Sequence, residues 1–499
     1  MNIRRFLFLG MVFLASPALA QFQAIAPANP SDPDDPKATP SVSLTLSPTA
    51  EPSPALKYQL LPTIGERAPG NGATYYYRAL LLMRQNIPES MNKEYGEKSE
   101  SWHKDPLDKM PRAEMQKWID VHSGVLRELK VATYREHCDF DLRVQDLRGM
   151  ETISFLLHDF QDMRQLARVL QIQARLQIAD GKLDEAFETL RMGYQLARDT
   201  AEPPFLINSL IGVAIASMMN ESLRELIDVP DSPNMYWAIA SLPQPLVDLR
   251  AAMQFEMNMP LQMFPFLKDP ETAERSTEQW QKLVTDATAS LLQMTDQSPA
   301  PGPEDSWQAQ LATTAMIAKA YPVAKQDLIA ANFDRERVEK MPVGQVMAIQ
   351  SARSYRYAYH EMFKWSLLPY AEAKPYMLQV EEKLKTEGYL GQPYSGREGM
   401  PMARLLLPAI SAVQSAGARS ERNFAALMNI EAIRLHAAAT GKLPKTLDEI
   451  KVVPVPNNPA TGQRFVYLVE GDQVTLGVPP ITSPQDGRWY VLTLDRAKK

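Results

Sequence analysis

Helical segments separated by prolines run through most of this chain, and they constrain its fold more than any other feature of the sequence. Between about residues 72 and 388, amphipathic patterns with the period of an α-helix recur one after another. Proline is tolerated in the first turn of a helix but disrupts its interior, so the prolines between these segments mark helix boundaries. The sequence therefore predicts a mainly α fold, a multi-helix array or bundle, for residues 72–388.

The clearest pair of helices is expected at residues 163–199, with Gly181 at the turn between them. The second helix carries one apolar stripe of residues at spacings of three and four: Leu183, Ala186, Phe187, Leu190, Tyr194 and Ala197. The first helix carries a narrow polar strip: Arg164, Arg168, Gln171 and Arg175. The apolar stripe predicts that the second helix is covered along one face by neighbouring structure.

This helix pair resembles a tetratricopeptide repeat (TPR) at its turn and in its second helix, through Gly181, Glu185, Ala186 and Phe187. The first helix departs from the repeat, since Ala174 stands where the repeat prefers Gly and Gln177 where it prefers Tyr. A stable array needs about three repeats, and the sequence contains one copy. The resemblance therefore implies a TPR-like helical hairpin.

An apolar run from Phe205 to Met219 is the most hydrophobic stretch beyond the first twenty residues. A helix that spans a membrane needs about 20 consecutive apolar residues, and this run is shorter. It also contains the polar residues Asn208 and Ser209. We therefore expect a buried central helix, and no membrane span in the mature chain.

Residues 402–499 are expected to form a separate module after a Gly- and Pro-rich linker at 389–401. Its long helix should end near Gly441, a residue suited to the left-handed position after a helix. Alternating apolar residues in RFVYLV and QVTL flank the turn sequence EGD and predict a hairpin, and RWYVLTL predicts a third strand. Because one hairpin is marginally stable alone, we expect a small antiparallel β-sheet packed on the long helix.

Two charged residues, Glu431 and Arg434, lie one turn apart within the apolar face of this long helix and are expected to pair. The module as a whole resembles the globular part of type II secretion pseudopilins. The shared features are the long helix, GKLPKTLDEI, a proline-spaced loop with NNPATG, and FVYLV opening a small sheet. Pseudopilins polymerise through an N-terminal hydrophobic helix that this module lacks, so the resemblance implies the fold and not polymerisation.

The N-terminal segment has the pattern of a secretory signal peptide over residues 1–20. Arg4 and Arg5 precede an apolar stretch, and Ala18-Leu19-Ala20 forms a small-residue cleavage site. Residues 21–71 are rich in Pro, Ser, Thr and Asp, a composition that predicts a disordered tether. The protein is therefore expected to be exported, to the periplasm or the extracellular space.

Along most of its length the chain resembles a set of uncharacterised secreted helical proteins of planctomycete-type bacteria. The resemblance lies in YYYRALLLM, RQLARVLQIQARLQIADGKLDEAF, PNMYWAIASLPQPLVDLR, VEKMPVGQV and IEAIRLHAAATGKLP. It implies export and a shared fold, and it assigns no activity.

Charge and cysteine content narrow the possible functions. The formal net charge is -6 and no run of Lys or Arg stands out, which disfavours nucleic-acid binding, since that needs a basic face. Cys138 is the single cysteine, so an intramolecular disulfide is impossible even in an oxidising compartment. It is either a buried small hydrophobic residue or a free thiol, and burial is favoured.

Few residues suggest catalytic or metal chemistry. His137, Asp139 and Asp141 place three possible metal ligands within five residues, and they are the candidate metal site. The sequence contains no HExxH, no zinc-type Cys/His spacing, no GxSxG and no Gly-rich phosphate loop, so no cofactor is predicted. A thiol nucleophile formed by Cys138 and His137 is disfavoured, because adjacent residues on regular structure usually point apart.

These observations favour an exported, non-enzymatic scaffold or protein-interaction module of the cell envelope, with a protein as its partner. An exported carboxylate- or metal-dependent hydrolase acting on carbohydrate or peptidoglycan is the alternative, since the chain offers 59 carboxylates from which a catalytic pair could form. A small-ligand binder is a third hypothesis and would require a sizeable apolar pocket. The oligomeric state stays open.

Overall fold

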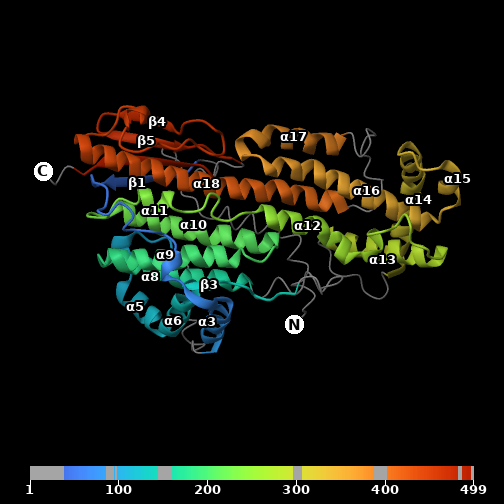
Figure 1. Ribbon diagram of the computed structural model, residues 1–499, viewed down its shortest axis with the longest axis horizontal. Helices are drawn as coiled ribbons and strands as arrows, with labels where there is room; N and C mark the ends of the chain where they lie inside the picture. The colour runs from blue at the N-terminus through green and yellow to red at the C-terminus, as the bar shows by residue number, and fades with distance from the viewer. Residues whose placement is uncertain are drawn as a thin grey trace. The chain divides into compact units, whose positions relative to one another are not determined.

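A computed structural model describes residues 39–85, 95, 98–99, 101–143, 160–295, 306–386, 402–481 and 486–495 (Figure 1). The predicted signal peptide and the predicted linker at 389–401 lie outside these residues. The chain divides into two compact units. The sheet unit contains the described residues up to 142, residues 160–249 and those from 415 onward, and the helical unit contains residues 250–414. The predicted mainly α fold with a small sheet near the C-terminus is confirmed.

The sheet unit contains all of the described strands. They are β1 (Ser41–Leu46), β2 (Ala68–Asn71), β3 (Arg135–His137), β4 (Val466–Glu470), β5 (Gln473–Val478) and β6 (Arg488–Leu494). Its helices are α3 (Ala73–Gln85), α5 (Arg112–Val121), α6 (Ser123–Thr133), α8 (Met163–Ala179), α9 (Leu183–Thr200), α10 (Leu206–Asp228), α11 (Tyr236–Ala240) and the C-terminal part of α18 (Met402–Thr440). Short 3-10 turns are η1 (Ile64–Glu66), η2 (Leu107–Lys109) and η6 (Leu447–Glu449).

Helices α8, α9 and α10 pack against one another in the middle of the sheet unit, as Figure 1 shows. The predicted hairpin is present as α8 and α9, and its apolar stripe is buried except for the half-buried Leu183. The predicted central helix is α10. Of the described helices it alone is long and apolar enough to cross a membrane, and 72% of its most apolar window is buried within the protein. The prediction of a buried central helix is thus confirmed.

The small sheet has the strand order β1-β6-β5-β4. Strands β4 and β5 form the predicted antiparallel hairpin, with Val466 opposite Gly477, and β6 is the predicted third strand, antiparallel to β5. The fourth strand, β1, was not predicted, and it pairs with β6 in parallel, with Ser41 opposite Trp489. The sheet is therefore mixed, because β1 runs parallel to β6 whereas the other two pairs of strands are antiparallel.

Residues 39–71 differ from the disordered tether expected over 21–71. Leu44, Leu46 and Leu60 are fully or almost fully buried in the core of the sheet unit. The segment SVSLTL has the alternation of a strand with one buried face, and that pattern outweighs the proline-rich composition around it. Residues 21–38 of the expected tether lie outside the described residues.

The long helix α18 is joined to two distant segments of the sheet unit by charged and polar groups. Glu431 and Arg434 form the expected ion pair, with 2.8 Å between Oε1 and Nη1, and both side chains are 0% exposed. Arg434 also donates to the carbonyl oxygen of Ser47 at 3.2 Å and to that of Ser232 at 2.8 Å. After the helix, Gly441 adopts φ +73°, as expected for the residue that ends it.

This packing changes the predicted domain division. The expectation was a separate module beginning at residue 402, but the C-terminal part of α18 and the sheet share one hydrophobic core with α8, α9 and α10. The first part of α18 belongs to the helical unit instead. The C-terminal module therefore has no core of its own among the described residues.

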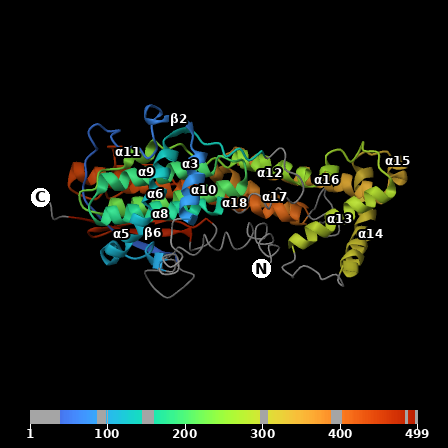
Figure 2. The same cartoon turned by 90° about the horizontal axis from the view of Figure 1, so that it is seen from below.

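The helical unit is built from residues 250–414. Its elements are α12 (Arg250–Met263), η4 (Pro265–Leu267), α13 (Thr277–Thr295), α14 (Ser306–Ala330), α15 (Arg335–Lys340), α16 (Val343–Phe363), η5 (Lys364–Leu367), α17 (Tyr370–Thr386) and the start of α18. Helices α13, α14 and α16 pack on one another (Figure 2). Tyr355 and Tyr359 of α16 donate hydrogen bonds to backbone carbonyl groups of α12, which joins these two helices.

Candidate functional site

The predicted metal residues lie at the end of β3 and in the turn that follows it. His137, Asp139 and Asp141 are all exposed. The Asp139 carboxylate accepts a hydrogen bond from the Asp141 backbone N–H at 2.8 Å, so it stabilises the turn. Within the described part of the chain, no group of three or more His, Cys, Asp or Glu side chains converges as a metal site would require. The structure thus does not bring these three residues together.

Cys138 points the other way from its neighbours and is buried, with 8% of its surface exposed. Burial raises the pKa of its thiol well above the ordinary value. The thiol is therefore protonated at neutral pH and is a poor nucleophile. The expectation that Cys138 is a buried small residue is confirmed.

Near Cys138, Asp199 of α9 forms a polar cluster between two helices. The Tyr76 hydroxyl of α3 donates to Asp199 Oδ2 at 2.6 Å, and the Gln195 amide donates to Oδ1 at 2.7 Å. Burial raises the pKa of Asp199 to about 6, despite these two hydrogen bonds. The cluster joins α3 to α9, and nothing in its geometry opens a space for a substrate, so we interpret it as structural.

A second set of buried charges joins α10 to the sheet. Arg488 of β6 donates to Glu221 Oε1 at 2.5 Å, and Arg224 contacts Glu221 Oε2 at 3.2 Å. These two arginines overcome the effect of burial and hold the pKa of Glu221 at about 2. Arg175 forms a comparable pair with Glu225, at 2.8 Å from Nε to Oε2. Glu221 is paired with two arginines and Glu225 with one, and these ion pairs stabilise the fold.

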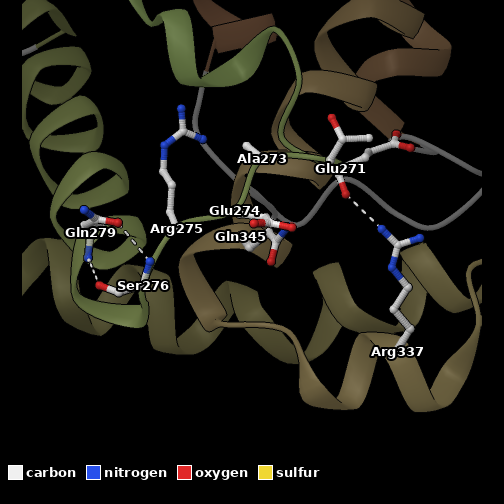
Figure 3. A pocket seen from close by; sticks show the side chains of 9 residues that line it. Glu271, Ala273, Glu274, Arg275, Ser276, Gln279, Arg337 and Gln345 are labelled. Carbon is white, nitrogen blue, oxygen red and sulfur yellow. Dashed lines mark hydrogen bonds between the residues drawn. The ribbon is translucent and has the colours of Figure 1, made fainter.

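The helical unit contains an open polar groove of about 750 Å³ (Figure 3). It is lined by Glu271, Thr272, Ala273, Glu274, Arg275, Ser276, Gln279, Arg337 and Gln345. Ser276 begins α13, where its backbone N–H donates to the Gln279 side chain at 2.9 Å and its hydroxyl accepts from the Gln279 N–H at 3.2 Å. Arg337 donates to the Glu271 carbonyl oxygen at 2.8 Å. The groove thus offers two carboxylates and two guanidinium groups, and little apolar surface.

Strand β4 carries three exposed large apolar side chains within four residues of the sheet unit. It lies at an edge of the four-stranded sheet, because only β5 pairs with it. Val466 is 38% exposed, Leu468 51% and Val469 44%. Leu468 and Val469 are adjacent and so point to opposite faces of the sheet, which means that β4 is exposed on both faces. Figure 1 shows β4 at the outside of the unit.

An edge strand with exposed Val and Leu side chains and without Lys or Pro is unusual. Natural proteins usually protect an edge with Lys, Pro, a bulge or a covering segment, because unpaired N–H and C=O groups can pair with another strand. The five residues of β4, VYLVE, contain neither Lys nor Pro, and no register shift interrupts their pairing with β5. The β4 edge, defined here as Val466–Glu470, is the candidate functional site.

Sequence reasoning identified β4 as a strand but not as the site, because the unpaired edge depends on the strand order. β4 lies at an edge because β6 pairs with β5 and β1 pairs with β6, so neither β6 nor β1 covers the free side of β4. The polar groove was also missed. Its one local sequence signal is the capping pattern of Ser276 and Gln279, which marks a helix start and carries no functional information.

Comparison with family models, with curated proteins and with solved structures finds no match.

Proposed function

We propose that the protein is an exported, non-enzymatic scaffold of the cell envelope that binds a protein partner by adding a strand to the β4 edge. The observation that carries the proposal is the exposure of Val466, Leu468 and Val469 on an edge strand that lacks protecting residues. In strand addition, backbone hydrogen bonds supply affinity and alternate side chains supply specificity. The partner would thus contribute an extended segment with apolar residues at alternating positions.

The pseudopilin-like C-terminal part and the TPR-like hairpin support the same proposal, because both resemblances are to proteins that assemble with other proteins. The signal-peptide pattern of residues 1–20 supports export to the periplasm or beyond. The envelope scaffold would use its sheet unit to present β4, since the sheet is fixed on α18 by a continuous core.

A site-specific crosslinking experiment tests this proposal in cells. A photoreactive amino acid replaces Leu468 in the full chain and, as a matched control, Val452, which is 49% exposed but lies outside the strand. We expect a discrete crosslinked partner from position 468 and not from position 452. Charged variants L468K and V469K should abolish the capture, whereas V452K should keep it. Equal capture by L468K and by the unchanged chain would contradict strand addition.

A truncation at residue 400 is unsuitable for this test. It would remove α18 and the sheet, whose residues share a core with α8, α9 and α10, so the remaining chain would lose its own packing. Point substitutions on the exposed side chains of β4 leave that core intact. Their far-UV circular dichroism and melting temperatures should match those of the unchanged protein.

Hydrolysis of carbohydrate or peptidoglycan is the second candidate, because the polar groove places Glu271 and Glu274 in one open space. Two carboxylates on either side of a glycosidic bond are the usual requirement for such chemistry. Incubation of the purified protein with peptidoglycan and polysaccharides tests it. Turnover that is lost in E274Q would favour the hydrolase and contradict a non-enzymatic scaffold.

A further inference from the structure

The polar strip of α8 separates into two halves with different environments. Arg175 is fully buried and satisfied: it pairs with Glu225 and donates to the carbonyl oxygens of Trp102 and Asp105. Gln171 donates to the Met218 carbonyl oxygen at 3.4 Å. These two residues are thus used by the fold itself.

Arg164 and Arg168, in the other half, contact no carboxylate within the described part of the chain. Arg168 donates only to the neutral side chain of Gln165, at 3.4 Å, and Arg164 has no hydrogen bond or ion pair there. Both side chains are half-buried. They lie four positions apart on one helix, so their Cβ atoms are about 6 Å apart and the two guanidinium groups repel one another. Burial and the charge of Arg168 lower the pKa of Arg164 accordingly.

His103 lies near Arg168, and its ring has no hydrogen-bond partner among the described residues. Both of its ring nitrogens are buried, and neither has a hydrogen-bond partner in the described residues. Burial lowers its pKa to about 3, and the charged groups that reinforce this effect are all cations: Arg168, Arg175 and Lys104. At neutral pH His103 is therefore a neutral imidazole with one N–H to donate.

We propose that Arg164 and Arg168, with His103 near Arg168, form a binding site for an oxyanion, either a carboxylate or a phosphate group. Two guanidinium groups one helical turn apart can hold one oxyanion between them through charge-assisted hydrogen bonds. The anion would supply the negative charge that the described residues around Arg164 and Arg168 do not provide, and it would accept a hydrogen bond from the N–H of His103. This site lies on α8 and is independent of the strand addition proposed at β4.

Isothermal titration of the full chain with pyrophosphate and, separately, with succinate tests the proposal at low ionic strength. We expect one of the two to bind more tightly than chloride and to lose affinity about tenfold or more in R164Q and in R168Q. The matched control is R112Q, which removes the same charge from an arginine that already pairs with Asp180 at 3.4 Å. Tighter binding of pyrophosphate would identify a phosphate ligand, and tighter binding of succinate a carboxylate.

Melting temperature in anion-poor buffer gives a second readout that a structural role would not reproduce. If Arg164 and Arg168 await an anion, R168Q should melt at the same or a higher temperature than the unchanged protein, because repulsion is relieved. If Arg168 holds the fold together, R168Q should melt lower. Binding that is no tighter than that of chloride, or equal losses in R112Q and R168Q, would overturn the proposal.

Discussion

The sheet unit and the helical unit use their charged residues in different ways. In the sheet unit, buried and half-buried arginines join segments far apart in sequence: the half-buried Arg488 contacts Glu221, 267 positions away, and the buried Arg434 contacts Ser232, 202 positions away. Among the described ion pairs of the helical unit, Lys340–Glu336 and Lys364–Glu361 join residues three or four positions apart near the surface. Exposed pairs of this kind contribute about 0–1 kcal/mol, whereas breaking a buried pair costs several times more.

Packing and hydrogen bonds to backbone carbonyl groups join the helices of the helical unit, and its ion pairs between distant residues, Lys325–Glu339 and Arg353–Glu271, are partly exposed. Tyr355 donates to the Glu256 and Met257 carbonyl oxygens of α12, and Gly344 lets α16 lie directly against the backbone of Trp280. This difference predicts which substitutions should destabilise each unit. Loss of one charge should affect the sheet unit most, and a change of side-chain volume should affect the helical unit.

The largest effect is expected from removing Arg434. In R434M the Glu431 carboxylate stays fully buried without its cation, which should cost about 3–5 kcal/mol of unfolding free energy. Urea denaturation measures this loss, and hydrogen exchange followed by mass spectrometry should locate it in the sheet unit. R464M is the control, since Arg464 pairs with Asp448 on an exposed surface, and it should change stability by less than about 1 kcal/mol.

Similar stability losses in R434M and R464M would contradict the claim that the buried ion pair stabilises the sheet unit more than an exposed pair does. The double variant E431Q/R434M sharpens it. Because this variant removes both charges, it should recover part of the stability that R434M loses.

The next largest effect concerns pH. Burial raises the pKa of Asp199 from 3.8 to about 6, so the folded state holds its proton more tightly than the unfolded state does. Its stabilising contribution is fully present below about pH 3.8 and is lost as the pH rises through 6, by about 3 kcal/mol in total. D199N should flatten the pH dependence of stability in that window, measured by urea denaturation from pH 4 to 7.

Glu221 lies in the same unit and should change the unfolding free energy with pH in the opposite direction. Its pKa is lowered from 4.5 to about 2, so its contribution is present above pH 4.5 and is lost as the pH falls toward 2. E221Q should therefore lose less stability than the unchanged protein when the pH falls toward 2. D199N should lose less stability than the unchanged protein when the pH rises through 6. If both variants change the pH dependence of the unfolding free energy in the same direction, burial alone would set the pKa of both carboxylates, and the arginines would have no effect on Glu221.

Much of this fold could be predicted because the signals were local. The stripe of α9, the apolar run of α10 and the hairpin of β4 and β5 each follow from residues close together in sequence. The fourth strand could not be predicted in the same way. Its six residues lie in a proline-rich segment, and their partner β6 lies more than 400 residues away, beyond any local pattern.

The candidate site was predictable only in part, for the same reason. The sequence VYLVE indicates a strand, but its role as an edge depends on the order of all four strands. The three predicted metal residues illustrate the opposite error. His137, Asp139 and Asp141 are close in sequence, yet the Asp139 carboxylate bonds to the backbone of the turn, so proximity did not produce a site. Arg164 and Arg168 were visible as a polar strip, but the sequence did not show that no described carboxylate contacts them.

The smallest of these effects should come from the helical unit, through volume and not charge. A Cβ atom added at Gly344 would lie 2.6 Å from the backbone carbon of Trp280, so G344A forces α16 and α13 apart. Such overpacking costs about 1–3 kcal/mol. G124A is the control: its added Cβ would lie 3.6 Å from Leu82 and 3.9 Å from Arg127, both ordinary contact distances, and an alanine within α6 should be neutral or stabilising. Hydrogen exchange should rise in α13 and α16 of G344A and stay unchanged in the sheet unit, whereas R434M should give the reverse pattern. Faster exchange in the sheet unit of G344A would mean that the two units unfold together as one cooperative structure. The separate vulnerability of the two units would then be contradicted.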